Sequence, residues 1–282
     1  MHQPVRAELH LSPRRLPLSF DWEDWFQLCC PPYDRPEALD RFECRLPRAT
    51  ELSLALCADL GATATWFCLG DQARRHPALL REIAARGHAI GLHGLTHRRA
   101  FEMDRAAWRI SMRDGKALLE DLAGVPVTGY RAPEWSLRGA ASEWCDDLPE
   151  LGFSYDSSRA PLPVIGDPAW PRRPHRLPNG LWELPPPVLS LGPWRVPMWG
   201  WGLRALPTGL LRRRLTALAA EDAGTPVVIH PWELDADQPA LPGASLGHRF
   251  AHSAGLKGYG ARLRKLLSGI RLVPLDAWVE AR

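Results

Sequence analysis

The residues best suited to do chemistry in this 282-residue chain are two histidines, His93 and His97, which follow a short apolar run. Neutral imidazole is the commonest metal ligand in proteins, and a spacing of about one turn lets two rings reach one ion. Gly91 and Gly94 argue against a long regular helix, so we expect a strand that ends in a sharp turn at His93, with His97 one turn further on. Two histidines on a surface loop are the alternative, which the spacing alone does not exclude.

Other side chains that can ligate a metal or transfer a proton also follow apolar runs. They are Asp21, Glu23 and Asp24 after residues 16–20, Arg131 after residues 125–130, Asp156 after residues 152–155, and His230 after residues 226–229. Catalytic groups of barrel folds sit at the carboxyl ends of strands, and polar residues scattered at random would not prefer such positions. The pattern therefore favours a metal-dependent hydrolase.

These residue types are sufficient for amide hydrolysis. A zinc-type ion lowers the pKa of a bound water toward about 7 and polarises a carbonyl oxygen. A nearby carboxylate can accept the proton of that water, and a histidine with a pKa near about 6.5 can protonate the leaving amine. Taken singly, each residue has a plainer alternative: Asp21 as a helix N-cap, Arg131 as an ion-pair partner and His230 as a core histidine.

Strands and helices that would position these residues alternate along the chain. Short apolar, β-branched or aromatic runs predict strands at residues 16–20, 63–69, 88–92, 125–130, 152–156, 226–229 and 270–273. Helical periodicity predicts helices at residues 49–60, 77–86, 105–123, 140–151, 206–223 and 259–267. This alternation is the βαβ pattern of a parallel α/β fold. Because no repeat or composition break divides the chain, we expect one domain over residues 1–282, with its core at about 16–273.

Composition argues against several classes of protein. The 35 basic and 32 acidic residues give a net charge of +3, too balanced to predict nucleic acid as a partner. The six cysteines form no C-x-x-C pair and lie in apolar segments, which favours free thiols in a reducing compartment. The N-terminus lacks the apolar core of a signal peptide, and no run approaches the roughly 18 apolar residues of a membrane span. We therefore expect a cytoplasmic protein; the sequence does not define its oligomeric state.

Seven segments, in this order and spacing, resemble the motifs of polysaccharide deacetylases that carry the NodB-homology domain. They are residues 19–26, 64–67, 81–88, 93–97, 129–133, 152–158 and 230–235. Within that family the sequence is similar to the group associated with exosortase and PEP-CTERM exopolysaccharide loci. The resemblance implies a deformed (β/α) barrel in which one acid and two histidines hold a divalent metal.

The resemblance also implies roles for individual residues. Asp21 matches the catalytic base, His93 and His97 the histidine ligands, Arg131 the arginine that orients the base, and His230 the general acid. The third ligand is Asp24 or Glu23, with Asp24 preferred, because Trp22 and Glu23 stand where many members have adjacent aspartates. Trp135 is expected to line the pocket, although Glu134 departs from the usual small or aromatic residue, and Asp156 to support His230.

The expected reaction removes N-acetyl groups from an amino sugar of an exopolysaccharide or its lipid-linked precursor. Zinc is the expected ion, and cobalt, manganese and nickel are alternatives. Trp199 and Trp201, at the end of a Trp-rich segment, have flat faces that could stack on sugar rings or belong to the core. Two other functions stay open: a metal-dependent amidase for a small non-sugar amide, and a catalytically inactive barrel that only binds glycans.

Overall fold

A curled sheet forms the centre of the protein, in a computed structural model that describes residues 15–30, 33, 38–192 and 194–282. Its strands are β1 (Arg15–Trp22), β2 (Thr65–Cys68), β3 (Ala89–Leu92), β4 (Val127–Tyr130), β5 (Tyr155–Asp156), β6 (His175–Arg176), β7 (Trp182–Glu183), β10 (Val227–Ile229) and β11 (Arg271–Val273). Their order is β10-β1-β2-β3-β4-β5-β7-β6, with β11 paired to the start of β1, and only the pairing of β6 with β7 is antiparallel. Because no pairing among the described strands joins β6 to β10, the sheet is a curled half-barrel. The predicted deformed (β/α) barrel is confirmed.

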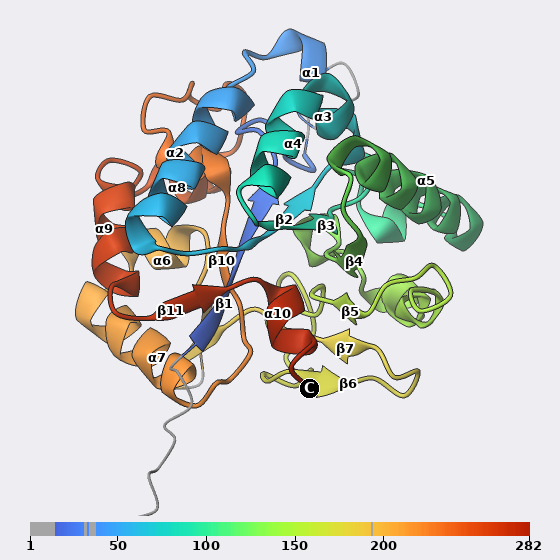
Figure 1. Ribbon diagram of the computed structural model, residues 1–282. Helices are drawn as coiled ribbons and strands as arrows, with labels where there is room; N and C mark the ends of the chain where they lie inside the picture. The colour runs from blue at the N-terminus through green and yellow to red at the C-terminus, as the bar shows by residue number, and fades with distance from the viewer. Residues whose placement is uncertain (1–14, 31–32, 34–37, 193) are drawn as a thin grey trace, which may run out of the picture.

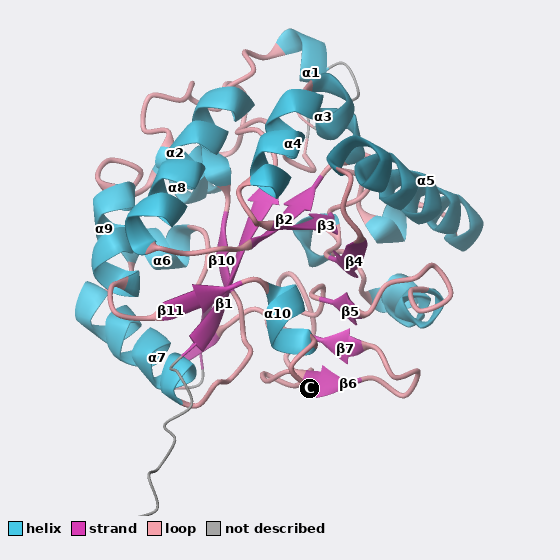
Figure 2. Ribbon diagram, in the orientation of Figure 1, coloured by secondary structure: helices cyan, strands magenta, loops and turns pink. Residues whose placement is uncertain are grey.

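Helices surround this sheet in Figures 1 and 2. They are α1 (Ala38–Arg41), α2 (Leu46–Leu60), α3 (Gly70–Arg75), α4 (Pro77–Ala85), α5 (Arg105–Ala123), α6 (Trp201–Ala205), α7 (Thr208–Ala220), α8 (Leu246–Ser253), α9 (Tyr259–Leu267) and α10 (Leu275–Val279). Helix α5 begins where predicted, since the Asp104 side chain accepts a hydrogen bond from the Ala107 amide. It ends where the left-handed backbone of Gly124 stops it.

The structure differs from the sequence prediction at one helix that was predicted and at one that was not. Residues 140–151 were expected to be α-helical, but they begin as the 3-10 helix η3 (Gly139–Asp147). Here the Ser142 hydroxyl bonds the Gly139 carbonyl and the Cys145 thiol bonds the Ser142 carbonyl, so side chains compete for carbonyls three residues back. Helix α8 was missed because it gives no core-facing apolar stripe; its large apolar side chains, Leu246 and Phe250, are exposed.

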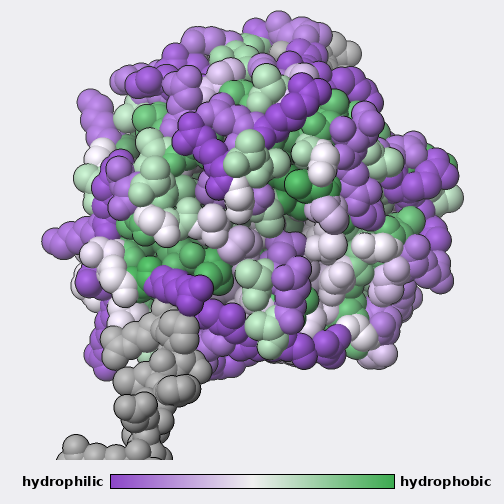
Figure 3. Space-filling view, viewed as in Figure 1, coloured by the Kyte–Doolittle hydropathy of each residue, from purple (hydrophilic) through white to green (hydrophobic). Residues whose placement is uncertain are grey.

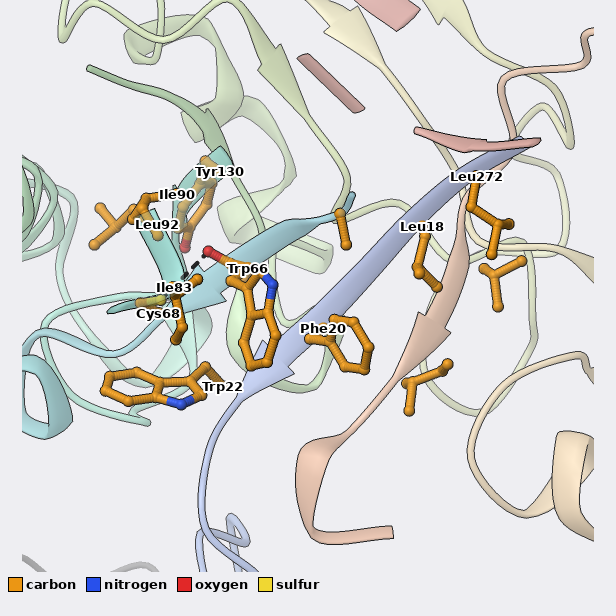
Figure 4. Packing of buried hydrophobic residues seen from close by; sticks show 14 of the residues in the cluster. Leu18, Phe20, Trp22, Trp66, Cys68, Ile83, Ile90, Leu92, Tyr130 and Leu272 are labelled. Atoms are coloured by element: carbon orange, nitrogen blue, oxygen red, sulfur yellow. Dashed lines mark hydrogen bonds between the residues drawn. The ribbon is translucent and has the colours of Figure 1, made fainter. Parts of the chain in front are cut away.

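The main core lies between the sheet and the helices. Alternate residues of β1, Leu16, Leu18, Phe20 and Trp22, are fully buried in it, as successive strand residues point to opposite faces. The Phe20 ring stacks on Trp66 of β2 at 4.5 Å, and Figure 4 shows these side chains among the neighbouring core residues. The alternate β1 residues, Ser19 and Asp21, therefore face the inside of the curl.

The inside of the curl is closed at the amino ends of the strands by α10. Its residues Leu275 and Trp278 pack with Phe67 and Tyr155 in a small apolar cluster. The Asp276 carboxylate accepts hydrogen bonds from the hydroxyls of Thr65, Thr128 and Tyr155 at 2.7–2.9 Å. Any site inside the half-barrel must therefore open at the carboxyl ends of the strands.

The remaining segments lie outside this framework. Much of residues 160–197 is loop, as expected, with a hairpin of β8 (Val188–Leu191) and β9 (Trp194–Pro197).

On the face drawn in Figure 3, hydrophilic side chains predominate and hydrophobic ones gather in small patches. Among the described residues, no helix has both the length and the apolar character needed to cross a membrane.

Candidate metal and catalytic site

The sheet brings the predicted residues to one end of the half-barrel. Asp21 lies at the end of β1, and His93, Arg131 and His230 directly follow β3, β4 and β10. Because β1 pairs in parallel with β10 and β2, and β3 with β2 and β4, these carboxyl ends lie side by side. The topology thus explains why residues more than 200 positions apart meet.

Glu23, His93 and His97 form a group that could hold a metal ion. One ligand atom from each lies within 4.8 Å of the others. Among the described residues, no other set of three histidine, cysteine or acidic side chains is arranged closely enough to hold a metal ion. Glu23 Oε2 lies 2.8 Å from His97 Nε2 and 3.6 Å from His93 Nε2. Glu23 and His93 are buried and His97 is nearly so, which leaves two imidazoles and one carboxylate around a common point.

The chain reaches this geometry through a bend rather than a helical turn. Residues 93–97 follow β3 without forming a helix, in contrast to the one-turn spacing that the sequence suggested. Gly94 has φ +98°, and a Cβ there would lie 2.8 Å from the Thr96 carbonyl oxygen. Only glycine fits this bend without strain, and the bend returns His97 toward His93.

The imidazoles are oriented from behind. His93 Nδ1 lies 2.8 Å from the carbonyl oxygen of Arg131, so Nδ1 carries the proton and Nε2 faces Glu23. His97 Nδ1 lies 3.4 Å from Cys29 Sγ. Burial alone would raise the pKa of Glu23, but attraction and hydrogen bonds from the histidines hold that pKa well below its usual value. Burial would likewise lower the pKa of His97, yet Cys29 and Glu23 raise it well above the usual range.

Asp24, the preferred third ligand in the sequence prediction, points elsewhere. Its Oδ2 accepts hydrogen bonds from the amides of Arg45 and Leu46 at 2.9 and 3.1 Å, where α2 begins. Its Oδ1 accepts from the Trp25 amide at 2.9 Å. Asp24 therefore satisfies free backbone donors at a helix start, which is a structural task. The structure brings Glu23, and not Asp24, to the two histidines.

Asp21 lies beside this group in an ion pair with Arg131. Arg131 Nη1 donates to Asp21 Oδ1 at 2.5 Å and to Ser19 Oγ at 2.9 Å. Nη2 donates to Ser157 Oγ at 2.9 Å, and the guanidinium lies 4.2 Å from the centre of the Phe67 ring. Arg131 is fully buried, so it can adopt little other geometry. Asp21 Oδ2 is left facing His230.

His230 faces both carboxylates. Its Nε2 lies 3.9 Å from Asp21 Oδ2 and 3.8 Å from Glu23 Oε1, which is close enough for charge attraction but too long for a direct hydrogen bond. Its Nδ1 lies 3.2 Å from Glu233 Oε2. Burial alone would lower the pKa of His230, but its hydrogen bond and charge interaction with Glu233 raise it to about 9.

Glu233 and Trp232 are site residues that the sequence prediction missed. Glu233 is fully buried and accepts from Arg204 Nε at 2.9 Å, opposite its contact with His230. Trp232 donates its indole N–H to Glu23 Oε1 at 3.2 Å. A glutamate three residues after His230 and two after Pro231 has capping-box spacing, and Glu233 does accept from the His230 amide. This spacing was the feature of the sequence from which the contact between Glu233 and His230 could have been predicted.

Asp156 does not support His230. It is fully buried at the end of β5, where it accepts a hydrogen bond from the Ser158 hydroxyl. Ser158 Oγ in turn accepts from the Ala132 amide at 2.8 Å. Asp156 therefore steadies the segment after Arg131, while Glu233 makes the contact with His230 that was expected of Asp156.

A cavity of about 260 Å³ adjoins His230. Its lining includes Trp199, Trp201 and Trp232, together with Ile165. Trp199 is buried and its ring lies 4.9 Å from that of Trp135, so Trp135 stands behind the lining rather than in it. Trp201, at the start of α6, is partly exposed to the cavity.

Comparison with protein families divides the chain into two matched segments. Residues 40–153 match the polysaccharide deacetylase family, and residues 157–280 match a domain of unknown function (DUF3473). The chain thus has one segment that is similar to polysaccharide deacetylases, followed by one that is similar to DUF3473. The first contains His93, His97 and Arg131, the second contains His230, and Asp21 and Glu23 precede both.

Curated relatives match a limited part of this chain. A peptidoglycan deacetylase of Helicobacter pylori is 32% identical over 95 residues, which are 34% of this chain and 31% of that protein. A chitooligosaccharide deacetylase of Rhizobium leguminosarum bv. trifolii is 39% identical over 51 residues, 18% of this chain and 24% of that protein. The matches span about a third or less of these relatives.

Solved structures share the fold over most of the chain. A Mycobacterium smegmatis protein assigned as a polysaccharide deacetylase has a TM-score of 0.63 at 22% identity, covering 95% of this chain and 89% of that one. The allantoinase Puue has a TM-score of 0.51 at 18% identity, covering 82% and 71%. At these identities the likeness establishes the half-barrel fold.

Proposed function

We propose that this protein is a metal-dependent hydrolase that removes N-acetyl groups from an amino sugar. The observation that carries the proposal is the convergence of Glu23, His93 and His97 beside the Asp21–Arg131 ion pair, with His230 facing both carboxylates. The match to the polysaccharide deacetylase family supports an N-acetylated carbohydrate as the substrate class.

The donor set supports a divalent ion. Two imidazole nitrogens and one carboxylate oxygen are a ligand set of catalytic zinc, which keeps a further position open for water or substrate. The same donors accept cobalt, manganese or nickel, so the set defines a class of ion with zinc as the first choice. The bond from His93 Nδ1 to the Arg131 carbonyl supports the same view, because it turns the free Nε2 toward the shared point.

Each catalytic residue has one task in the proposed reaction. A bound divalent ion would polarise the acetyl carbonyl and make a water molecule more acidic. Asp21 Oδ2, which is free of Arg131, accepts the proton of the attacking water, while Arg131 fixes the carboxylate through Oδ1. As the amide C–N bond breaks, His230 Nε2 protonates the leaving amine, and Glu233 holds the ring through Nδ1. The products are acetate and the free amino sugar.

The proposal also covers the substrate's setting. We place the amino sugar in an exopolysaccharide or its lipid-linked precursor, with the protein in the cytoplasm and in the exosortase-associated group. None of the six cysteines, all of which lie among the described residues, forms a disulfide bond, and this suits a reducing compartment. The tryptophan-lined cavity at His230 suits the face of a sugar ring.

A mass-spectrometric assay tests the proposal. Metal-stripped protein, and the same protein reloaded with zinc, are incubated with N-acetylglucosamine oligomers and with a small cyclic amide such as allantoin. Loss of acetyl from the sugars only in the zinc-loaded sample is expected. Hydrolysis of the cyclic amide alone would favour a small-amide hydrolase, and sugar binding without metal or turnover would favour an inactive barrel.

A further inference from the structure

The two histidines of the proposed metal site have different partners behind them. His93 Nδ1 bonds the backbone carbonyl of Arg131 at 2.8 Å, a contact that does not depend on any side chain. His97 Nδ1 lies 3.4 Å from Cys29 Sγ, so a thiol takes the place that a carbonyl or carboxylate usually fills. Sulfur is a weak hydrogen-bond acceptor, so the contact of His97 with Cys29 is weaker than that of His93 with the Arg131 carbonyl.

The Cys29 thiol makes two contacts with the same residue. Its S–H donates to the His97 carbonyl oxygen at 3.2 Å. Since the thiol proton is used there, the sulfur lone pairs are left to accept the Nδ1–H of the same histidine. This arrangement leaves His97 Nε2 as the nitrogen that faces Glu23 Oε2 at 2.8 Å.

Cys29 is itself held by the segment after β4. Glu134 Oε1 accepts a hydrogen bond from the Cys29 amide at 3.0 Å. Glu134 has φ +49°, a left-handed conformation that a non-glycine residue adopts at a cost of about 1–3 kcal/mol. The four residues from Arg131 to Glu134 thus brace both histidines: Arg131 through its carbonyl, and Glu134 through Cys29.

We infer that Cys29 is a positioning residue that holds His97 in the tautomer and orientation suited to bind a metal ion. Cys29 is 6% exposed, so the contact is shielded from water. The inference rests on the proposed metal site, but it concerns metal affinity and ring tautomer, which are measured without turnover. It also gives Glu134 a task, as the residue that anchors Cys29.

Zinc titration of the metal-free full chain tests the inference. Affinity is measured by competition with a chromophoric chelator for the wild type, Cys29→Ala, Cys29→Ser and Cys57→Ala. Loss of an outer partner typically weakens metal binding about 10–100-fold, which is the expectation for Cys29→Ala. Serine can donate and accept in the same two directions and should recover part of the affinity. Cys57 is 1% exposed in the main core, so its alanine variant controls for loss of a buried thiol.

Nitrogen NMR of the zinc-loaded proteins supplies the second readout. The wild type and Cys57→Ala are expected to show His97 protonated at Nδ1, and Cys29→Ala a mixture of states or a shifted signal. The inference is overturned if Cys29→Ala binds zinc within about twofold of the wild type, or if Cys57→Ala loses as much affinity. A wild type that binds zinc but deacetylates no sugar overturns the proposed function alone, and one that binds no divalent ion overturns both.

Discussion

Two pairs of buried carboxyl groups lie at strand ends of this sheet, and they have different kinds of partners. Asp21 and Glu23, at the end of β1, face Arg131 and the site histidines. Asp156 and Glu183 are register partners on β5 and β7, and their carboxyl groups contact each other. Attraction from the histidines holds the pKa of Glu23 well below its usual value, whereas burial and the neighbouring Asp156 hold that of Glu183 well above.

The contrast shows that a position at a strand end identifies a residue as a candidate for the site but does not tell what role the residue has. In the sequence, Asp156 looks like Asp21, because each follows an apolar run. Of these two aspartates, only Asp21 forms an ion pair with an arginine and has a second oxygen that faces His230. In the other pair, Asp156 accepts a hydrogen bond from the Ser158 hydroxyl and Glu183 accepts one from the Arg159 amide. These two carboxyl groups therefore stabilise the loop after β5. A carboxylate of the candidate site is thus distinguished from a structural one by two features: a cationic partner, and an oxygen that faces the other residues of the site.

The largest expected effect separates Glu23 from its neighbour Asp24. Glu23→Gln should lose most bound metal and with it the activity, since one anionic ligand of three is removed. Asp24→Asn should keep the metal but lose about 1–3 kcal/mol of stability, because its NH₂ group would face backbone N–H donors. Elemental analysis and thermal unfolding measure the two effects. A metal-free Asp24→Asn beside a metal-loaded Glu23→Gln would reverse the assignment.

Asp21→Asn comes next in expected size. The amide cannot accept the proton of water, so turnover should fall about 10²–10⁴-fold while metal remains bound. Because Arg131 loses its buried counter-charge, stability also falls, and kcat must be measured per folded, metal-loaded molecule. If Asp21→Asn loses its metal instead, Asp21 is a metal ligand and belongs with Glu23, His93 and His97.

Much of the fold was predictable because its strands are short apolar runs bounded by turns. Helix ends at Gly61 and Gly124 were equally clear, since both glycines adopt left-handed conformations there. The choice between Glu23 and Asp24 was not predictable. The chain turns tightly after β1, with the Glu23 amide bonding the Asp21 carbonyl, and alternation no longer tells which way each side chain points.

Residues that act through tertiary contacts were also beyond the sequence. Cys29 reaches His97 across 68 positions, and Arg204 reaches Glu233 across 29. Neither has a local pattern that distinguishes it from an ordinary buried thiol or a surface arginine. Such residues become visible only when the sheet places distant loops together.

The acid pair gives a smaller, pH-dependent effect. Because the pKa of Glu183 is raised on folding, its contribution to stability is complete below the ordinary glutamate pKa and is lost as pH rises through the raised value. Glu183→Gln cannot ionise, so its unfolding temperature should fall less than that of the wild type between about pH 5 and pH 9. Parallel pH profiles for the two proteins would mean that the pair does not share a proton. Metal content should be the same in both.

The smallest expected effect distinguishes two tryptophans of the cavity. Trp199 is 4% exposed and packs on Trp135, so Trp199→Ala should mainly cost stability, about 3–5 kcal/mol, and slow all substrates alike. Trp201 is partly exposed to the cavity and can stack on a sugar. Stacking contributes about 0.5–1.5 kcal/mol, so Trp201→Ala should lower kcat/KM for an N-acetylated oligosaccharide about two- to tenfold.

The substrate comparison decides what Trp201 contacts. If it binds a ring remote from the scissile amide, its loss should slow an oligosaccharide more than a monosaccharide, because remote binding energy is then used in the transition state. The ratio of the two kcat/KM values, measured for Trp201→Ala and Trp199→Ala side by side, cancels differences in the folded fraction. Equal ratios in both variants would show that Trp201, like Trp199, packs against the protein, and the sugar would then have to contact another wall of the cavity.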